Sequence, residues 1–139
     1  MPNILIVKLP QGSNHIIVDE TTQQNQLDPN KNRPQSIYWL LDDPLLDMNA
    51  QFRPIHPLQG NPGFKWVSPP PSAEIFDQPG LIENSTVLRI RDHHQDTNSA
   101  GSWSYVLWVS VPGGPEYHTV KGNNVAFVGG GDSPLIRNK

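Results

Sequence analysis

The chain contains no cysteine among its 139 residues. This absence excludes disulfide bonds, thiolate catalysis and every zinc site that depends on sulfur ligands. The side chains that remain for binding a metal ion are those of histidine, aspartate and glutamate.

A long apolar run is also lacking near the N-terminus. The apolar segment from Ile4 to Val7 is followed at once by Lys8 and Pro10. Such a segment is too short for the core of a signal peptide or for a membrane-spanning helix. We therefore expect a soluble cytoplasmic protein without membrane insertion, for which release by lysis or by a leaderless route stays open.

Blocks of like charge are absent as well. Residues 1–70 carry six acidic and five basic side chains, and residues 71–139 carry seven and five. A nucleic-acid groove or an anionic membrane surface requires a basic stripe, and no such stripe is present. We expect neither nucleic acid nor membrane as a partner.

The sequence lacks the common catalytic motifs. It contains no nucleophile elbow, no phosphate-binding loop and no helical metalloprotease motif. The glycine-rich residues 129–131 do not lead into the lysine and hydroxyl residue of a phosphate loop, so we interpret them as a turn. We expect a protein that is not an enzyme and has no cofactor.

What the sequence does contain is many short apolar segments separated by turn formers. Fifteen prolines and eleven glycines accompany an apolar content of 35%, which is typical of short strands joined by irregular loops. The expected strands are residues 3–9, 14–18, 36–41, 86–91, 103–111, 116–121, 125–128 and 135–137. We expect strand 103–111 to pair with 86–91 on one side and with 116–121, across Pro112–Pro115, on the other.

Between these strands the sequence predicts one helix and two long loops. Asp43 followed by Pro44 is typical of an N-cap residue followed by the first residue of a helix. Leu45, Met48 and Phe52 would share one face of that helix. A short helix is therefore expected near 44–52. Residues 20–36 and the proline-rich residues 54–79 are expected to be loops, the second a stiff surface segment rather than a ligand for a partner domain. The whole pattern predicts one all-β domain over residues 1–139, an antiparallel β-sandwich of Ig-like or jelly-roll-like type.

Strand 103–111 is apolar on both faces. Its odd-numbered residues form the expected core face, whereas Val106 and Trp108 lie between Ser104 and Ser110 on the other face. A strand that is apolar on both faces is normally covered on both. We favour cover of Val106 and Trp108 by a loop of the same chain, with a second subunit or a ligand as the alternatives.

The loop before this strand holds the densest group of polar ligands. Adjacent residues of an extended chain point in opposite directions, so His93 and His94 cannot both join Asp92 or Asp96 in one metal site. Asp96 and Asn98 offer oxygen atoms to calcium, but the loop lacks the glycine and the glutamate of an EF-hand. We favour a solvated hairpin tip, with His93, His94, Asp96 and His118 kept as metal candidates.

These observations lead to three hypotheses of function. The first is a non-catalytic structural or assembly subunit, in which Trp108 and Val106, joined by Trp66, contact another copy or a protein partner. The second is a carbohydrate-binding module that stacks a glycan on an exposed tryptophan beside Asp92, Asn98 or Arg91. The third is a metal-dependent enzyme that uses His93 or His94 with His118 and a carboxylate.

Overall fold

The computed structural model describes residues 3–19, 26–67, 69–119 and 134–139. Within them the chain is mostly β, arranged as two sheets, with the 3-10 helix η1 (Thr97–Ser99) as its helical element. The strands are β1 (Asn3–Lys8), β2 (Ile17–Asp19), β3 (Gln26–Leu27), β4 (Gln35–Leu41), β5 (Gln51–Phe52), β6 (Phe64–Trp66), β7 (Gly80–Ile82), β8 (Val87–Asp92), β9 (Gly101–Ser110), β10 (Glu116–His118) and β11 (Leu135–Asn138). The expected strand 125–128 and the expected turn at 129–131 lie outside the described residues.

The first sheet has the order β2-β1-β4-β8-β7. β1 and β2 form the expected hairpin, whose turn is closed by the Ser13 amide donating to the Pro10 carbonyl at 3.0 Å. β1 then pairs with β4 in parallel, with Leu5 opposite Trp39. The expectation of an entirely antiparallel fold is therefore wrong here, and also at β3 and β11, which are parallel too. β2 runs antiparallel to β1, whereas β4 starts at the same end of the sheet as β1.

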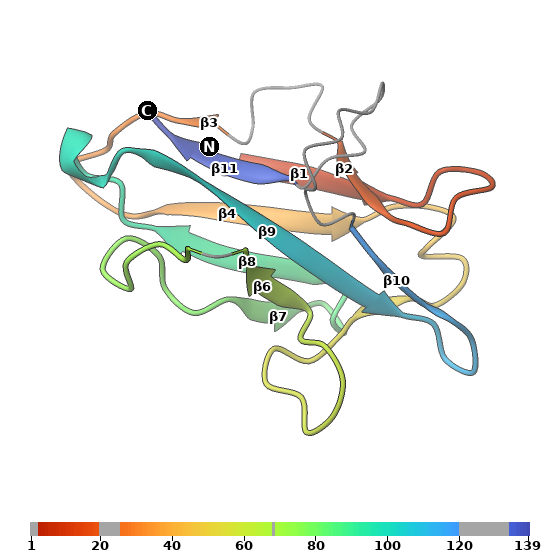
Figure 1. Cartoon of the computed structure of the whole chain (residues 1–139). Coiled ribbons are helices and arrows are strands. Elements are labelled where there is room, and N and C mark those ends of the chain that lie inside the picture. Colours follow the sequence, from red (N-terminus) through yellow and green to blue (C-terminus); the bar gives the residue numbers. More distant parts are fainter. Residues whose placement is uncertain (1–2, 20–25, 68, 120–133) are drawn as a thin grey trace.

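The second sheet is built around β9, the longest strand (Figure 1). β10, β11, β5 and β6 all pair with β9, and β3 extends the sheet beyond β11. The expected pairing across the turn at Pro112–Pro115 is confirmed, since Tyr117 lies opposite Val109. The expected pairing of 86–91 with 103–111 is wrong. Both edges of β8 are already occupied, by β4 and by β7, and residues 93–100 carry the chain from one sheet to the other.

One apolar core receives side chains from both sheets. β1, β4 and β8 contribute alternate residues, as does β9 through Tyr105, Leu107 and Val109, which confirms the expected core face of that strand. Trp39 and Tyr105 join the two sheets directly. The Trp39 Nε1 donates to the Tyr105 hydroxyl at 2.8 Å, and the two rings meet edge to face at 5.2 Å.

The expected helix near 44–52 is not formed. Residues 43–49 make successive turns, in which the Met48 amide donates to the carbonyls of both Pro44 and Leu45. Asn49 has a φ of 58°, in the left-handed region, so the helical path ends there and the chain enters β5. The apolar residues that suggested a helical face are buried without forming a helix, since Leu45 and Phe52 both lie in the core.

Candidate functional site

The loop between β8 and β9 separates its two histidines, as the alternation of side chains predicts. His93 turns toward Asp77, and its Nε2 lies 2.8 Å from Asp77 Oδ1. His94 is 1% exposed, and its ring nitrogens Nε2 and Nδ1 lie 2.7 Å from the main-chain oxygen of Lys139 and 2.7 Å from Ser99 Oγ. Each histidine therefore has a local structural partner.

Asp92 is fully buried at the end of β8 and is not available to a ligand in the solvent. It belongs to a group that we call the Asp92 cluster, made of Asp92, His94, Ser99 and Asn138. The Asn138 Nδ2 donates to Asp92 Oδ1 at 3.0 Å and to the Ser99 carbonyl at 3.1 Å. The cluster thus ties β11 to the loop before β9.

Burial raises the pKa of the Asp92 carboxyl to about 7, against the opposing effects of the Asn138 hydrogen bond and of His93. Its second oxygen, Oδ2, is buried without a hydrogen-bond partner within the described residues, as is Asn138 Oδ1. Desolvation therefore disfavours the charged form of this carboxyl. The cluster fastens a strand to a loop at a cost in stability.

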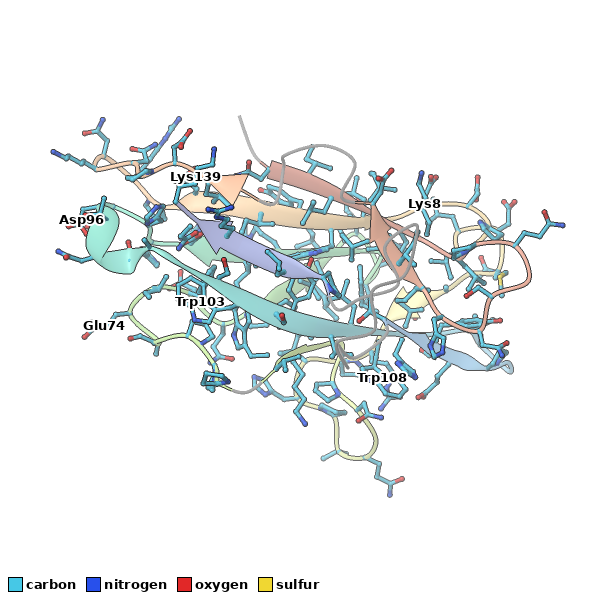
Figure 2. The ribbon with its side chains drawn as sticks, turned by 45° about the horizontal axis from the view of Figure 1, so that its top comes forward. Lys8, Glu74, Asp96, Trp103, Trp108 and Lys139 are labelled. Carbon is cyan, nitrogen blue, oxygen red and sulfur yellow. The ribbon has the colours of Figure 1, made fainter. Side chains whose placement is uncertain are left out.

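The remaining metal candidates do not converge. Within the described residues, no three histidine, aspartate or glutamate side chains lie close enough together to hold a metal ion. Asp96 instead caps η1, where its Oδ1 accepts from the Asn98 amide at 2.9 Å. His118 stacks on Trp108 from the neighbouring strand, and Figure 2 shows Trp108 far along β9 from Asp96.

The even face of β9, where sequence reasoning placed the interface, is largely covered by the chain itself. Val106 is 8% exposed. Trp108 is half-buried, and the His118 ring stacks on it with the centroids 4.4 Å apart. Trp66 lies opposite Tyr105 across the β6–β9 pair, so it occupies the core side and not the side of Val106.

An apolar surface that sequence reasoning missed lies on the first sheet, on the side turned away from the core. We call it the outer face. Residues that alternate with core residues form a continuous row across four strands, because Ile6 lies opposite Leu40, Leu40 opposite Val87, and Val87 opposite Ile82. Ile4 and Tyr38 form a second row beside it. Ile4 on β1 is 41% exposed, and Ile82 on the edge strand β7 is 39% exposed. Solvent therefore reaches the outer face at both of these strands.

The two ends of the outer face carry opposite charge. On β8, Arg91 lies beside the start of β4, opposite Ser36, and Arg89 lies beside the middle of β4, opposite Tyr38. Asp42 and Asp43 follow the end of β4, and Glu83 lies at that end between β7 and β8. None of these five charged residues forms an ion pair within the described residues, where the pairs are Lys8–Asp19, Arg53–Glu116, His93–Asp77 and Lys139–Asp28.

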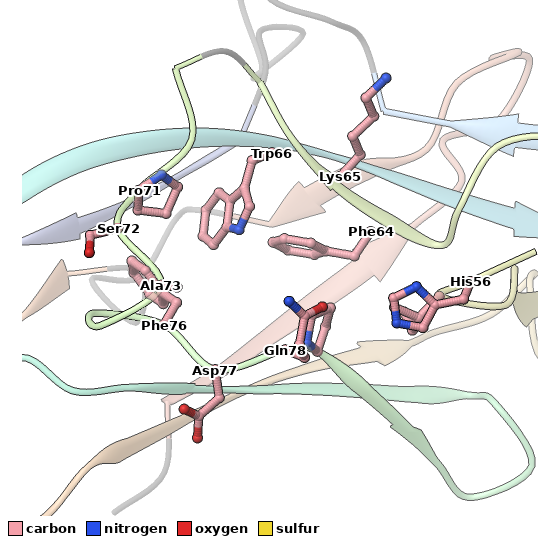
Figure 3. Close-up of a pocket in the computed structure, with 12 residues that line it drawn as sticks. His56, Phe64, Lys65, Trp66, Pro71, Ser72, Ala73, Phe76, Asp77 and Gln78 are labelled. Atoms are coloured by element: carbon pink, nitrogen blue, oxygen red, sulfur yellow. The ribbon is translucent and has the colours of Figure 1, made fainter.

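A pocket with a volume of about 280 Å³ opens beside β6, where the proline-rich segment crosses from the second sheet toward β7 (Figure 3). Its lining includes Phe64, Trp66 and Phe76 with polar side chains around them. The predicted proline-rich loop thus contains a short edge strand and forms one wall of a pocket. Sequence reasoning noted Trp66 but not the residues that face it.

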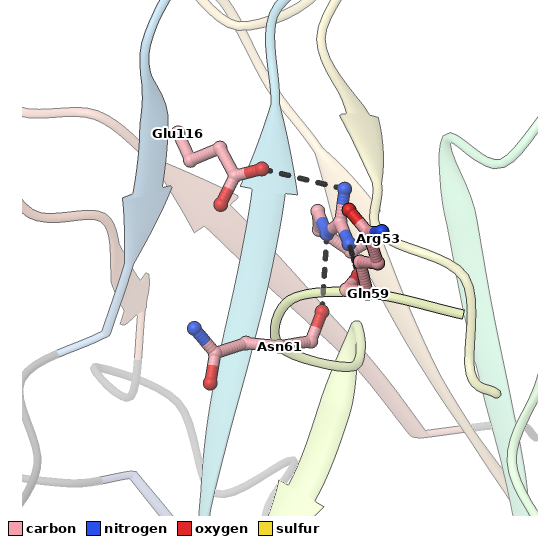
Figure 4. A network of polar contacts seen from close by, with 4 residues as sticks. All are labelled: Arg53, Gln59, Asn61 and Glu116. Carbon is pink, nitrogen blue, oxygen red and sulfur yellow. Dashed lines mark hydrogen bonds and ion pairs between the residues drawn. The ribbon is translucent and has the colours of Figure 1, made fainter. Parts of the chain in front are cut away.

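Arg53 fixes the loop that leads into this pocket. Its Nε donates to the Asn61 carbonyl at 3.0 Å, and its Nη2 donates to the Gln59 carbonyl at 2.6 Å. Its Nη1 also lies 3.3 Å from a carboxylate oxygen of Glu116 on β10 (Figure 4). A single guanidinium therefore holds residues 59–61 against the second sheet, just before β6.

Comparison with family models, with curated proteins and with solved structures gives no match. The described part of the chain holds no helix with the length and apolar character needed to cross a membrane.

Proposed function

We propose that this protein is a non-catalytic β-sandwich subunit, of Ig-like or jelly-roll-like type, that associates with a second copy of itself through the outer face. The sandwich class is supported by the single core shared between the two sheets. Association is supported mainly by the apolar row Ile6–Leu40–Val87–Ile82, which crosses four strands. Contiguous apolar surface that solvent can reach is enriched at interaction sites, and in this row Ile82 is exposed while Ile6, Leu40 and Val87 are partly exposed.

The charges around the outer face favour a second copy as the partner. Two copies that pack face to face with antiparallel strand axes place Arg89 and Arg91 of each over the acidic end of the other. The apolar rows then meet at the centre, as in a self-complementary two-fold interface. The opposite, parallel arrangement brings like charges together and is disfavoured.

The size of the face indicates a reversible dimer. The five strands hold 6, 3, 7, 6 and 3 residues. At about 4.8 Å between strands and about 3.3 Å per residue they cover roughly 400 Å² per copy, or roughly 800 Å² for the pair, which is the range of weak and transient contacts. Specific interfaces begin at about 1,000 Å² of total buried surface. We therefore expect a dissociation constant on the order of micromolar, which rises with added salt because the end charges are exposed.

Sedimentation equilibrium tests this proposal with the double variant Leu40→Thr/Val87→Thr. Threonine keeps the β-propensity and the shape of the strands but places hydroxyls at the centre of the interface. We expect the dissociation constant to rise at least about tenfold, which corresponds to about 1.4 kcal/mol. The variant should keep the circular dichroism spectrum of the wild type.

Trp108→Ser is the matched control on the other sheet, and we expect it to leave association unchanged. Wild-type protein that stays monomeric at hundreds of micromolar would overturn the proposal. If Trp108→Ser is monomeric while the double variant still dimerises, the interface lies at Val106 and Trp108 and not at the outer face.

A further inference from the structure

The pocket beside β6 has a rigid aromatic wall. Trp66 is half-buried, and its ring is held between Phe76 at 4.9 Å and Phe64 at 4.9 Å, measured between ring centroids. Phe64 and Phe76 are themselves each 5% exposed and belong to the core. Because its neighbours are fixed by the core, the indole is already ordered before any ligand arrives, and this lowers the entropic cost of binding.

Polar side chains surround the opening. His56, Ser72, Asp77 and Gln78 all line the pocket and are exposed. Asp77 is held by its contact with His93 Nε2 at 2.8 Å, and Figure 3 shows its carboxylate directed away from the three aromatic rings. Gln78 provides both an amide donor and a carbonyl acceptor. The rim therefore presents donors and acceptors at the edge of an apolar wall.

Among the described residues that line the pocket, Lys65 alone has a permanent positive charge. Figure 3 shows the Lys65 amine directed away from the three aromatic rings, so Lys65 lines the pocket without turning its charge toward them. A phosphorylated or carboxylated ligand would lack a cation there to pair with. The arrangement favours a neutral ligand with one apolar face and polar edges.

We propose that this pocket binds one ring of a neutral carbohydrate. The C–H face of a pyranose would lie on Trp66, and its hydroxyls would reach Gln78 and His56. At about 280 Å³ the cavity is near the small end of ligand pockets, so it fits a single ring better than an extended peptide. This binding activity is additional to self-association, since the pocket and the outer face use different residues.

The site differs from the glycan site considered from the sequence. That hypothesis relied on Asp92, Asn98 or Arg91 beside an exposed tryptophan. Asp92 is fully buried and Asn98 belongs to the capped turn of η1, so neither lines the pocket. The tryptophan that fits a sugar is Trp66, and its polar partners are Gln78 and His56.

Tryptophan fluorescence titration with methyl glycosides of glucose, galactose, mannose and N-acetylglucosamine tests the proposal. We expect a saturable change with at least one of them in the wild type and in Trp108→Phe, which removes an indole outside the pocket. Trp66→Phe should abolish the change. Gln78→Ala, an exposed substitution that leaves the core intact, should weaken binding about fivefold, the effect of one neutral hydrogen bond.

The titration is repeated on Leu40→Thr/Val87→Thr, the variant designed to weaken self-association. Sugar binding by this variant is then measured independently of the dimer. No saturable response to any of the four glycosides would overturn the proposal. A response that Trp66→Phe and Gln78→Ala both leave unchanged would also overturn it. If a proline-rich peptide binds saturably and none of the four glycosides does, the pocket binds a different class of ligand and the carbohydrate proposal is wrong.

Discussion

Asp92→Asn should stabilise the protein at pH 8 by about 3 kcal/mol. Asp92 is fully buried, and its pKa is raised from 3.8 to about 7 because burial disfavours the charged carboxylate. Three pKa units correspond to about 4 kcal/mol of destabilisation once the carboxyl is ionised. Asparagine keeps an oxygen for the Asn138 Nδ2 and carries no charge. The expected gain is somewhat smaller than 4 kcal/mol because the new amide group must also be accommodated.

The sign of this effect depends on pH in a defined way. Between pH 3.8 and about 7 the folded state keeps the proton of Asp92 while the unfolded state loses it, so the wild type loses stability as pH rises through this range. The variant lacks this loss. The difference between the two proteins should therefore be small near pH 4 and reach its full value above pH 7.

Urea unfolding at several pH values between 4 and 8 measures this difference. Asp96→Asn is the matched control, because Asp96 is an exposed carboxylate in the same loop. If Asp92→Asn is less stable than the wild type at pH 8, the Asp92 carboxylate is stabilised by its surroundings and our description of the cluster is incorrect.

Gly63→Ala should destabilise the protein by about 3 kcal/mol or more. A Cβ at this position would overlap with the Arg53 carbonyl oxygen and would lie 3.2 Å from the Arg53 nitrogen, and both are backbone atoms that cannot turn away. The Gly63 amide donates to the Pro54 carbonyl, and its carbonyl accepts from the Trp108 amide at 3.1 Å. The clash therefore separates residues 53–54 from the start of β6, and overpacking of this kind is costly.

Thermal unfolding followed by circular dichroism measures this prediction, and we expect the melting temperature to fall by about 10 °C. Gly80→Ala is the control, since its Cβ would meet no atom within 4 Å. The same substitution at Gly63 should weaken any sugar binding, because it displaces Phe64 and Trp66. Equal melting temperatures for the two variants would contradict the close approach at Gly63.

Local patterns in the sequence predicted most of the strands correctly. Alternating or apolar runs identified β1, β4, β8 and β9, and the turn at Pro112–Pro115 identified the β9–β10 hairpin. Both kinds of evidence are local, because alternation and turn chemistry depend only on neighbouring residues. The partner of a strand without a short hairpin is not local information. This is why β8 pairs with β4 and β7 and not with β9 as expected.

The functional surfaces were harder to predict, although part of the signal was present. The runs NILIVKL and SIYWLL are apolar at successive positions, so β1 and β4 were apolar on both faces in the same way as strand 103–111. Only their parallel pairing places Ile6 beside Leu40 and reveals a patch. The pocket forms where a loop crosses between the edges of the two sheets. The course of such a loop does not follow from a periodic pattern in the sequence, so the pocket could not be predicted.

A charge-exchange experiment tests association through the outer face most directly. Arg89→Glu/Arg91→Glu makes both ends of the face acidic, and Asp42→Lys/Asp43→Lys gives the acidic end a net positive charge, because the two lysines outweigh Glu83. In the antiparallel dimer, each variant alone would place like charges together, whereas a mixed dimer would place opposite charges together at both ends.

Sedimentation velocity at low salt, on each variant and on their equimolar mixture, gives the answer. We predict that each variant alone is monomeric at a concentration where the wild type is dimeric, and that mixing them restores the dimer. Association through this face would be contradicted if each variant alone dimerises as strongly as the wild type. It would also be contradicted if the mixture stays monomeric at a concentration where the wild type dimerises.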